Sequence, residues 1–213
     1  MSRNTGLKGR LDRPLDLSNL RSIAFEDAAF RKGELNSKAL LVAVVMDGFH
    51  ISDLSFSYIT VDGLDVTDRM VELGLKMSGD FDVILLHGAP YGGFNIVDVE
   101  RLYSKLSSPV ISVISSKPNE DAVHEALTKH FQDWILRLNL LEKFKPIFSI
   151  DLKGFTVYTS CYGIDVDHAI DILRKLTVIG KLPEPLRVAR LIARSLPMNL
   201  CEQISYVDCN SCL

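Results

Sequence analysis

The sequence contains no long apolar run. Its longest uninterrupted stretch, Ala39 to Met46, has eight residues, whereas a helix that crosses a membrane needs ~20. The polar first residues also lack the apolar core of a signal peptide. We therefore expect a cytoplasmic protein without membrane contacts.

Cysteine is scarce, and the two signs of charge are nearly balanced. Four cysteines in 213 residues exclude a disulfide scaffold, and three of them, Cys201, Cys209 and Cys212, are expected to be free thiols because no second pair completes a zinc site. The 24 basic and 27 acidic residues give a net charge of -3, which excludes a global basic field for nucleic acid. Any phosphate contact must be local.

The length and the 47% hydrophobic content are typical of a folded globular chain. Because no stretch rich in Pro, Gly or Ser is long enough to separate two domains, we expect one domain over residues 1–213. Within it, residues 1–19 are expected to form a flexible basic arm and residues 197–213 a tail. A homo-oligomer is compatible with the sequence, which contains no pattern that fixes the number of subunits.

Hydrophobic patterning predicts a mixed α/β sheet. Three strands are expected first, at residues 20–25, 39–46 and 54–61, with a hairpin at Asp47-Gly48. Helices and strands then alternate: a helix over 66–77 capped by Asp65, a strand over 81–86, a helix over 96–106 capped by Asn95, and a strand over 110–114. Three antiparallel strands followed by helical crossovers form the ribonuclease-H-like order.

The rest of the chain is expected to extend this fold. It comprises a largely helical region over 121–141, a hairpin of strands 147–152 and 155–160, and helices over 166–176 and 186–196.

Carboxylates occur where the predicted strands end. Glu26 and Asp27 end the first strand, and Asp62 and Asp65 follow the third. Successive strand residues point to opposite faces, so one of Glu26 and Asp27 is expected to be structural. Carboxylate oxygens suit Mg²⁺ or Mn²⁺, which Asp27 would hold together with Asp62 or Asp65 to polarise a phosphodiester. The structural alternative is that these residues only end strands and cap a helix.

The fourth strand leads into a glycine-rich segment, residues 87–95. It lacks the Lys and Ser/Thr of a Walker A loop, although Gly92-Gly93 and a helix starting near residue 96 could receive a phosphate or nucleotide. His87 could ligate a metal, act as acid or base, or only accept a hydrogen bond. Lys117, at the same sheet edge, could contact a phosphate or simply be an exposed lysine.

Three arginines follow helical spacing near the end of the chain. Arg187, Arg190 and Arg194 are expected on one stripe of the last helix. They would form either its solvated face or a ridge that binds the phosphates of nucleic acid.

Four segments together resemble a mainly archaeal family, catalogued as domain of unknown function 99, whose fold is similar to that of endonuclease V. They are residues 24–30, 59–68, 92–98 and 182–189, and the resemblance spans nearly the whole chain. Asp27, with an aromatic residue three positions later, resembles the first metal-binding aspartate of endonuclease V. Residues 108–113 are similar to the strand of that family that leads into a lysine.

Two departures limit what the resemblance implies. Relatives usually have Asp-Gly where this chain has His87-Gly88, so the metal preference would move toward Mn²⁺ or Zn²⁺, or hydrolysis would be lost. The Pro-Tyr-x-Pro segment with which endonuclease V wedges bases apart has no counterpart, so recognition of a deaminated base is not implied.

The first functional hypothesis is a metal-dependent, endonuclease-V-like nuclease. Asp27, His87 and Lys117 would be its catalytic residues. The alternative is a non-catalytic module on the same scaffold that binds nucleic acid or a nucleotide.

Overall fold

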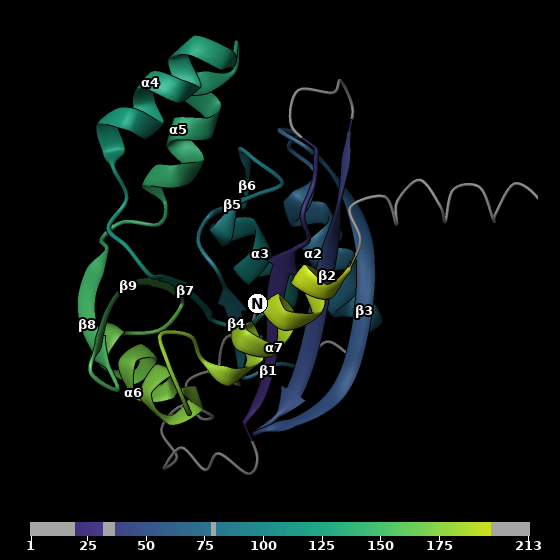
Figure 1. Ribbon diagram of the computed structural model, residues 1–213, viewed down its shortest axis with the longest axis vertical. Helices are drawn as coiled ribbons and strands as arrows, with labels where there is room; N and C mark the ends of the chain where they lie inside the picture. Colours follow the sequence, from purple (N-terminus) through teal and green to yellow (C-terminus); the bar gives the residue numbers. More distant parts are fainter. Residues whose placement is uncertain (1–19, 32–36, 78–79, 197–213) are drawn as a thin grey trace, which may run out of the picture.

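The computed structural model describes residues 20–31, 37–77 and 80–196 (Figure 1). The arm expected at residues 1–19, the tail expected at 197–213 and the three C-terminal cysteines lie outside the described residues. None of the helices in the described ranges is both long and apolar enough to cross a membrane.

Seven strands form one mixed sheet in the order β3-β2-β1-β4-β7-β9-β8. Their bounds are β1 Arg21–Asp27, β2 Lys38–Asp47, β3 His50–Thr60, β4 Val83–Leu86, β7 Val110–Ile114, β8 Phe148–Leu152 and β9 Phe155–Tyr162. The first three are antiparallel neighbours, whereas β4 pairs in parallel with both β1 and β7. The ribonuclease-H-like order and both predicted hairpins are thus confirmed.

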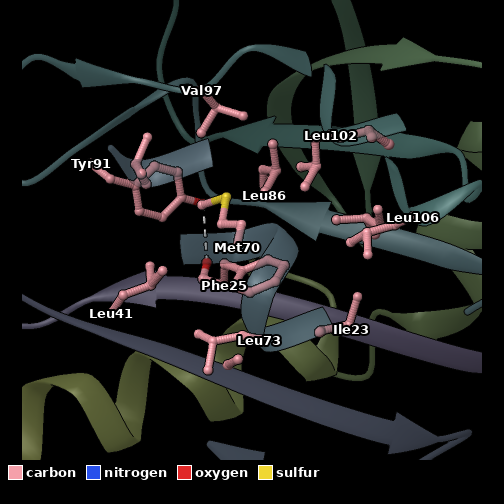
Figure 2. Close-up of a cluster of buried hydrophobic side chains, with 14 of the residues drawn as sticks. Ile23, Phe25, Leu41, Met70, Leu73, Leu86, Tyr91, Val97, Leu102 and Leu106 are labelled. Atoms are coloured by element: carbon pink, nitrogen blue, oxygen red, sulfur yellow. Dashed lines mark hydrogen bonds between the residues drawn. The ribbon is translucent and has the colours of Figure 1, made fainter. Parts of the chain in front are cut away.

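Helices cover both faces of the sheet. Their bounds are α2 Val66–Lys76, α3 Val99–Leu106, α4 Glu120–His130, α5 Trp134–Glu142, α6 Val166–Leu176 and α7 Glu184–Ser195. α2 and α3 pack on one face, around the side chains shown in Figure 2. α6 and α7 pack on the other face, and α7 crosses β1 and β2. The α4–α5 pair stands to one side of these layers, above β8 and β9 in the view of Figure 1.

Burial of alternate residues explains the two cores. Ile23 and Phe25 of β1 face α2 and α3, whereas Ala24 faces the opposite core. All four residues of β4 are buried because helices cover both sides of this central strand. The centre of the sheet, at β1 and β4, is therefore enclosed.

Two predicted helices are wrong in their bounds. The helix expected over 96–106 begins at Val99, because Asp98 accepts the Arg101 N–H and caps it. The preceding residues instead form a small hairpin of β5 Pro90–Tyr91 and β6 Asn95–Ile96. The helical region over 121–141 is divided into α4 and α5, with residues 131–133 between them.

Candidate active site at the carboxyl edge of the sheet

The strand directions bring the predicted site residues to one edge of the sheet. β1, β4 and β7 are parallel, and β3 runs the same way because two antiparallel pairings separate it from β1. Asp27 ends β1, His87 follows β4, and Asp62 follows β3. This edge is where open α/β sheets bind ligands.

Glu26 and His87 form an ion-pair-like contact at this edge. Phe25 is paired with Leu86 in the parallel register, so the next residue of each strand lies beside the other. His87 Nδ1 is 3.0 Å from Glu26 Oε2 and 3.1 Å from Oε1, and the side chains are only 19% and 11% exposed. In the tautomer that donates Nδ1–H to the Glu26 carboxylate, Nε2 is left free to accept a hydrogen bond.

Asp27 points to the opposite face from Glu26, as strand geometry requires. Its Oδ2 accepts the Gly92 N–H at 2.7 Å. Burial raises the pKa of Asp27, the Gly92 hydrogen bond lowers it in part, and the neighbouring charge of Glu26 raises it again. The charge of His87 lowers it slightly, and the net effect is a raised pKa, because burial is the largest of these influences.

Tyr91 fixes the ends of β1 and β4 relative to each other. Its hydroxyl donates to the Phe25 carbonyl oxygen at 3.1 Å, a bond drawn in Figure 2. The Tyr91 hydroxyl oxygen in turn accepts the His87 N–H at 3.0 Å. The ring is completely buried, and burial keeps the pKa of Tyr91 well above its ordinary value. Tyr91 therefore remains a neutral, positioning group.

Asp62, like Asp27, forms hydrogen bonds with the backbone of the turn around Gly92. Its N–H donates to the Gly92 carbonyl oxygen, and its Oδ1 accepts the Phe94 N–H, both at 2.8 Å. A side chain at Gly93 would place its Cβ 2.2 Å from that oxygen, so the glycine permits the contact. The Gly92 and Phe94 N–H groups thus serve two carboxylates of the chain. The helix expected to start near residue 96 begins at Val99, and phosphate binding by Gly92-Gly93 stays a prediction.

Asp65 is also occupied by the protein itself. It sits at the cap position of α2, but its side chain accepts the N–H and the hydroxyl of Thr60 and the amide of Asn95. Burial opposes ionisation, yet these hydrogen bonds outweigh it and lower the pKa of Asp65. The Val66 N–H is donated instead to Asn95 Oδ1. Asp65 thus stands at the predicted N-cap position of α2 but makes no capping hydrogen bond with its side chain, whereas the predicted cap Asn95 is wrong, because Asp98 caps α3.

The structure does not assemble the predicted metal set. Within residues 20–31, 37–77 and 80–196, no three of His, Cys, Asp or Glu lie close enough together to hold a metal ion. Asp27, Asp62 and Asp65 reach the same edge, but each carboxylate is directed at backbone or amide N–H groups. The physical reason is that the strand ends need these acceptors to close their turns.

Arg137 of α5 is a buried side chain that joins three segments, and no sequence pattern predicted this role. Its guanidinium donates to the carbonyl oxygens of Asp62, Gly63 and Phe94 at 2.9, 3.0 and 2.6 Å. It also pairs with Asp133, and the side chain is only 5% exposed. One residue therefore fastens the α4–α5 pair to the β3–α2 corner and to the β5–β6 turn.

The predicted basic residues lie at different places. Lys117 is exposed beyond β7, in a groove that also contains Lys145 and Tyr158. On α7, Arg187 is paired with Glu184, so it is less available for a phosphate than expected. Arg190 and Arg194 form no ion pair with any residue of the described ranges.

Residues 18–197 match the family described as endonuclease dU. A UPF0215 protein of Pyrococcus furiosus is 36% identical over 180 residues, which cover 83% of this chain and 92% of that protein. A UPF0215 protein of Thermoplasma volcanium is also 36% identical, over 85% of this chain and 92% of its own. Archaeal relatives are thus confirmed.

Solved structures show the same fold. A protein of unknown function from Archaeoglobus fulgidus superimposes with a TM-score of 0.73 at 25% identity, over 82% of this chain and 96% of that one. Endonuclease V from Ciona intestinalis, in complex with DNA containing an inosine, gives a TM-score of 0.55 at 12% identity over 83% of this chain and 85% of its own. The expected likeness to the endonuclease V fold is confirmed.

Proposed function

Because the chain belongs to the endonuclease dU family, we propose that it is an endonuclease that hydrolyses phosphodiester bonds in DNA containing deoxyuridine. The observation that carries this proposal is the Glu26–His87 pair beside Asp27, at the carboxyl ends of two adjacent parallel strands. Deoxyuridine contains a deaminated base, so the family's description favours a substrate that the resemblance to endonuclease V did not imply.

Mg²⁺ or Mn²⁺ fits the donor set of this edge as a cation bound together with DNA. Asp27 is the carboxylate that would hold the cation, because it does not pair with a lysine or arginine of the described ranges, whereas both oxygens of Glu26 face His87 Nδ1. Mg²⁺ is commonly held by one or two carboxylates and completed by substrate phosphates, without an all-protein cage. When bound, the cation supplies positive charge that polarises the phosphodiester.

The chain's own residues supply orientation and proton transfer. Glu26 holds Nδ1–H of His87, which leaves Nε2 to accept a proton from the attacking water. The water oxygen bonds to phosphorus, the bond from phosphorus to the leaving oxygen breaks, that oxygen takes up a proton from solvent, and His87 Nε2 releases its proton to solvent. Asp27 is kept in place by the Gly92 N–H. Lys117, farther along the same edge, is proposed to contact a phosphate of the bound strand.

The test is cleavage of a DNA duplex that contains one deoxyuridine, with thymidine at that position as reference, in Mn²⁺ or Mg²⁺. Asp27→Asn should lower the cleavage rate at least about a hundredfold, because the neutral amide no longer attracts a cation. Asp171→Asn, the same change at an exposed position of α6, should cleave like the wild type. Unchanged activity in Asp27→Asn would exclude the proposed site.

A non-catalytic DNA-binding module is the second candidate. It is favoured by the lack of a three-ligand metal group in the described ranges and by His87, which stands at a strand end where an acid was expected. Such a module would bind DNA in EDTA with strong salt dependence and would not cleave it in any divalent metal.

A further inference from the structure

β3 is an edge strand of the sheet and the longest strand in the described part of the chain. It pairs with β2 on one side, and no strand of the described ranges lies on its other side (Figure 1). The N–H and C=O groups of such an edge can pair with another strand, so proteins normally protect edges with short strands, charges or a covering helix. β3 has eleven residues without lysine or arginine, and Asp53 is its single acid.

One face of β3 is apolar and exposed. Ile51, Leu54 and Phe56 are paired with residues of β2 that lie in the core beneath α6 and α7, so they share that face of the sheet. α7 crosses β1 and β2, whereas these three side chains, and Phe49 in the turn before β3, remain between 40% and 55% exposed. Together they present on the order of 350 Å² of apolar surface, and patches of this size commonly mark interaction sites.

The direction of the backbone groups of β3 follows from its pairing with β2. The Val61 N–H, just after β3, donates to the Ser37 carbonyl oxygen at 2.8 Å. In an antiparallel ladder, residues that bond to the partner strand alternate with residues that do not. Counting back along the register, the N–H and C=O groups of Leu54 and Phe56 point to the open edge. The Leu54 N–H donates there to its neighbour's side chain, Asp53 Oδ1, at 2.7 Å.

We propose that β3 pairs with β3 of a second copy of this chain, antiparallel about a two-fold axis at Ser55. Leu54 of each copy then lies opposite Phe56 of the other, and the two residues exchange both backbone hydrogen bonds. Their side chains meet on the exposed apolar face. The register of β3 with β2 is irregular just before Asp53, so the regular ladder comprises residues 53–57. Such an interface uses the same patch on both copies and closes at two.

Charge favours this arrangement over other ways of pairing two β3 strands. Asp53, Ser55 and Ser57 share the face opposite to the apolar patch. In the proposed register, Asp53 lies opposite Ser57 of the second copy, whose hydroxyl can donate to the carboxylate. The two Asp53 residues are then four positions apart, about 13 Å, which exceeds the ~8 Å screening length at physiological salt. A parallel pairing in register would place the two carboxylates directly opposite each other, which is destabilising.

The size of the patch indicates a reversible dimer. Two copies would bury roughly 700 Å² of apolar surface together with the backbone of the ladder, near the ~1,200 Å² at the lower end of specific interfaces. We therefore expect a dissociation constant in the micromolar range. Because the two β3 strands run in opposite directions, the carboxyl edges of the two sheets lie at opposite ends of the dimer. Each copy keeps its own candidate active site, so this inference does not depend on the proposed function.

The first experiment is sedimentation velocity of the full chain from about 1 to about 500 μM, a range that spans the expected dissociation constant. The mass should rise with concentration from that of one chain toward that of two. Phe56→Lys places a charge in the apolar pair and should weaken self-association at least tenfold. Ile179→Lys, the same kind of change at an exposed apolar position between α6 and α7, is the matched control and should associate like the wild type.

Disulfide trapping tests the register. Ser55→Cys places two thiols opposite each other at the two-fold axis, with their Cα atoms ~4.5 Å apart, which suits a disulfide. Ser57→Cys, on the same face, places them about 13 Å apart, which is too far. Under mild oxidation, Ser55→Cys should form a linked dimer at least tenfold faster than Ser57→Cys. In both proteins the C-terminal thiols are removed by the changes Cys201→Ser, Cys209→Ser and Cys212→Ser.

Three results overturn the inference: the mass of one chain at every concentration, a dimer that persists unchanged in Phe56→Lys, or equal linkage in the two cysteine variants. Hydrogen exchange identifies a different occupant of the edge. Protection of residues 53–57 should increase with protein concentration. Strong protection that is the same at every concentration would mean that another segment of the same chain pairs with β3, and it would also exclude the dimer.

Discussion

Asp27 is the residue on which the proposed chemistry depends, and its surroundings act against its charge. It is a largely buried carboxylate with one backbone donor and a second acid beside it. A cation near Asp27 would favour the ionised carboxylate and so offset the cost of burying its charge. The same carboxylate that costs stability in the free protein is therefore suited to attract positive charge together with substrate.

The raised pKa of Asp27 predicts how the free protein's stability depends on pH. An acid whose pKa is higher in the folded than in the unfolded state adds in full to the free energy of unfolding when the pH is below its unfolded pKa, near 3.8. This stabilisation is lost as the pH rises through the folded pKa. Asp27→Asn stays neutral and keeps an oxygen for the Gly92 N–H. In EDTA at pH 7 it should melt at the same or a higher temperature than the wild type, and the difference should vanish below pH 3.8. A clearly lower melting temperature at pH 7 would contradict this.

Single residues also show why the site was only partly predictable. The choice of Asp27 and His87 followed from strand ends, whereas Glu26 was set aside because it points away from Asp27. Its partner became visible only with the register of β1 and β4, which aligns Glu26 with His87. Asp65 and Asn95 were both expected as caps, but tertiary contacts bind their side chains to each other. Sequence patterns carry no signal for such a pairing over 30 residues.

At the scale of elements, strands were easier to predict than helix ends. Buried runs of β-branched residues fixed β2, β4 and β7 to within two residues of their observed bounds. The first turn of α3 was misplaced because Asn95 and Asp98 are both good caps three residues apart. The break between α4 and α5 contains neither proline nor glycine. What ends α4 is the packing of Phe131 on Phe94 and under Arg137, which is a tertiary contact.

The attachment of α5 through Arg137 gives a prediction for that element. Arg137→Met leaves the carbonyl oxygens of Asp62, Gly63 and Phe94 without their donor, and should lower the free energy of unfolding by about 3 kcal/mol. Hydrogen exchange should become faster in α5 and at residues 92–94, measured by mass spectrometry.

The control for this variant is Arg101→Met. Arg101 is exposed and pairs with Asp68 on the surface, so its loss should cost less than about 1 kcal/mol. If Arg137→Met is no more destabilising than Arg101→Met, the guanidinium does not hold α5 to the edge.

On the scale of the whole molecule, the carboxyl edge of the sheet carries candidate site residues on both faces of the sheet. Glu26 and His87 continue the face covered by α6 and α7, whereas Asp27 continues the face covered by α2 and α3. A DNA strand that crosses the edge can therefore be contacted from both faces. With a net charge of -3, the molecule has no general attraction for DNA, so the proposed function requires a few local cationic side chains to position the strand.

Salt dependence of DNA binding tests which cations these are. Arg190→Ala with Arg194→Ala on α7 should reduce the slope of log K against log salt by about 2, since each phosphate contact contributes roughly 0.9. Arg174→Ala with Lys181→Ala, which removes two exposed charges elsewhere, should leave the slope unchanged. Equal slopes for all three proteins would assign the α7 stripe to the solvated surface. The measurement is fluorescence anisotropy in EDTA.

The close approach of Gly93 to Asp62 has a consequence for how related chains can diverge. Positions 62 and 93 lie on different segments, yet a side chain at 93 would occupy the space of the Asp62 carboxylate. The two positions should therefore change together over evolution. A chain that keeps the aspartate in this contact favours glycine at 93, where φ is also positive, whereas a chain that has replaced the aspartate by a smaller residue is released from the steric part of that restriction. A protein with an alanine at 93 and an intact aspartate at 62 would need a differently shaped turn.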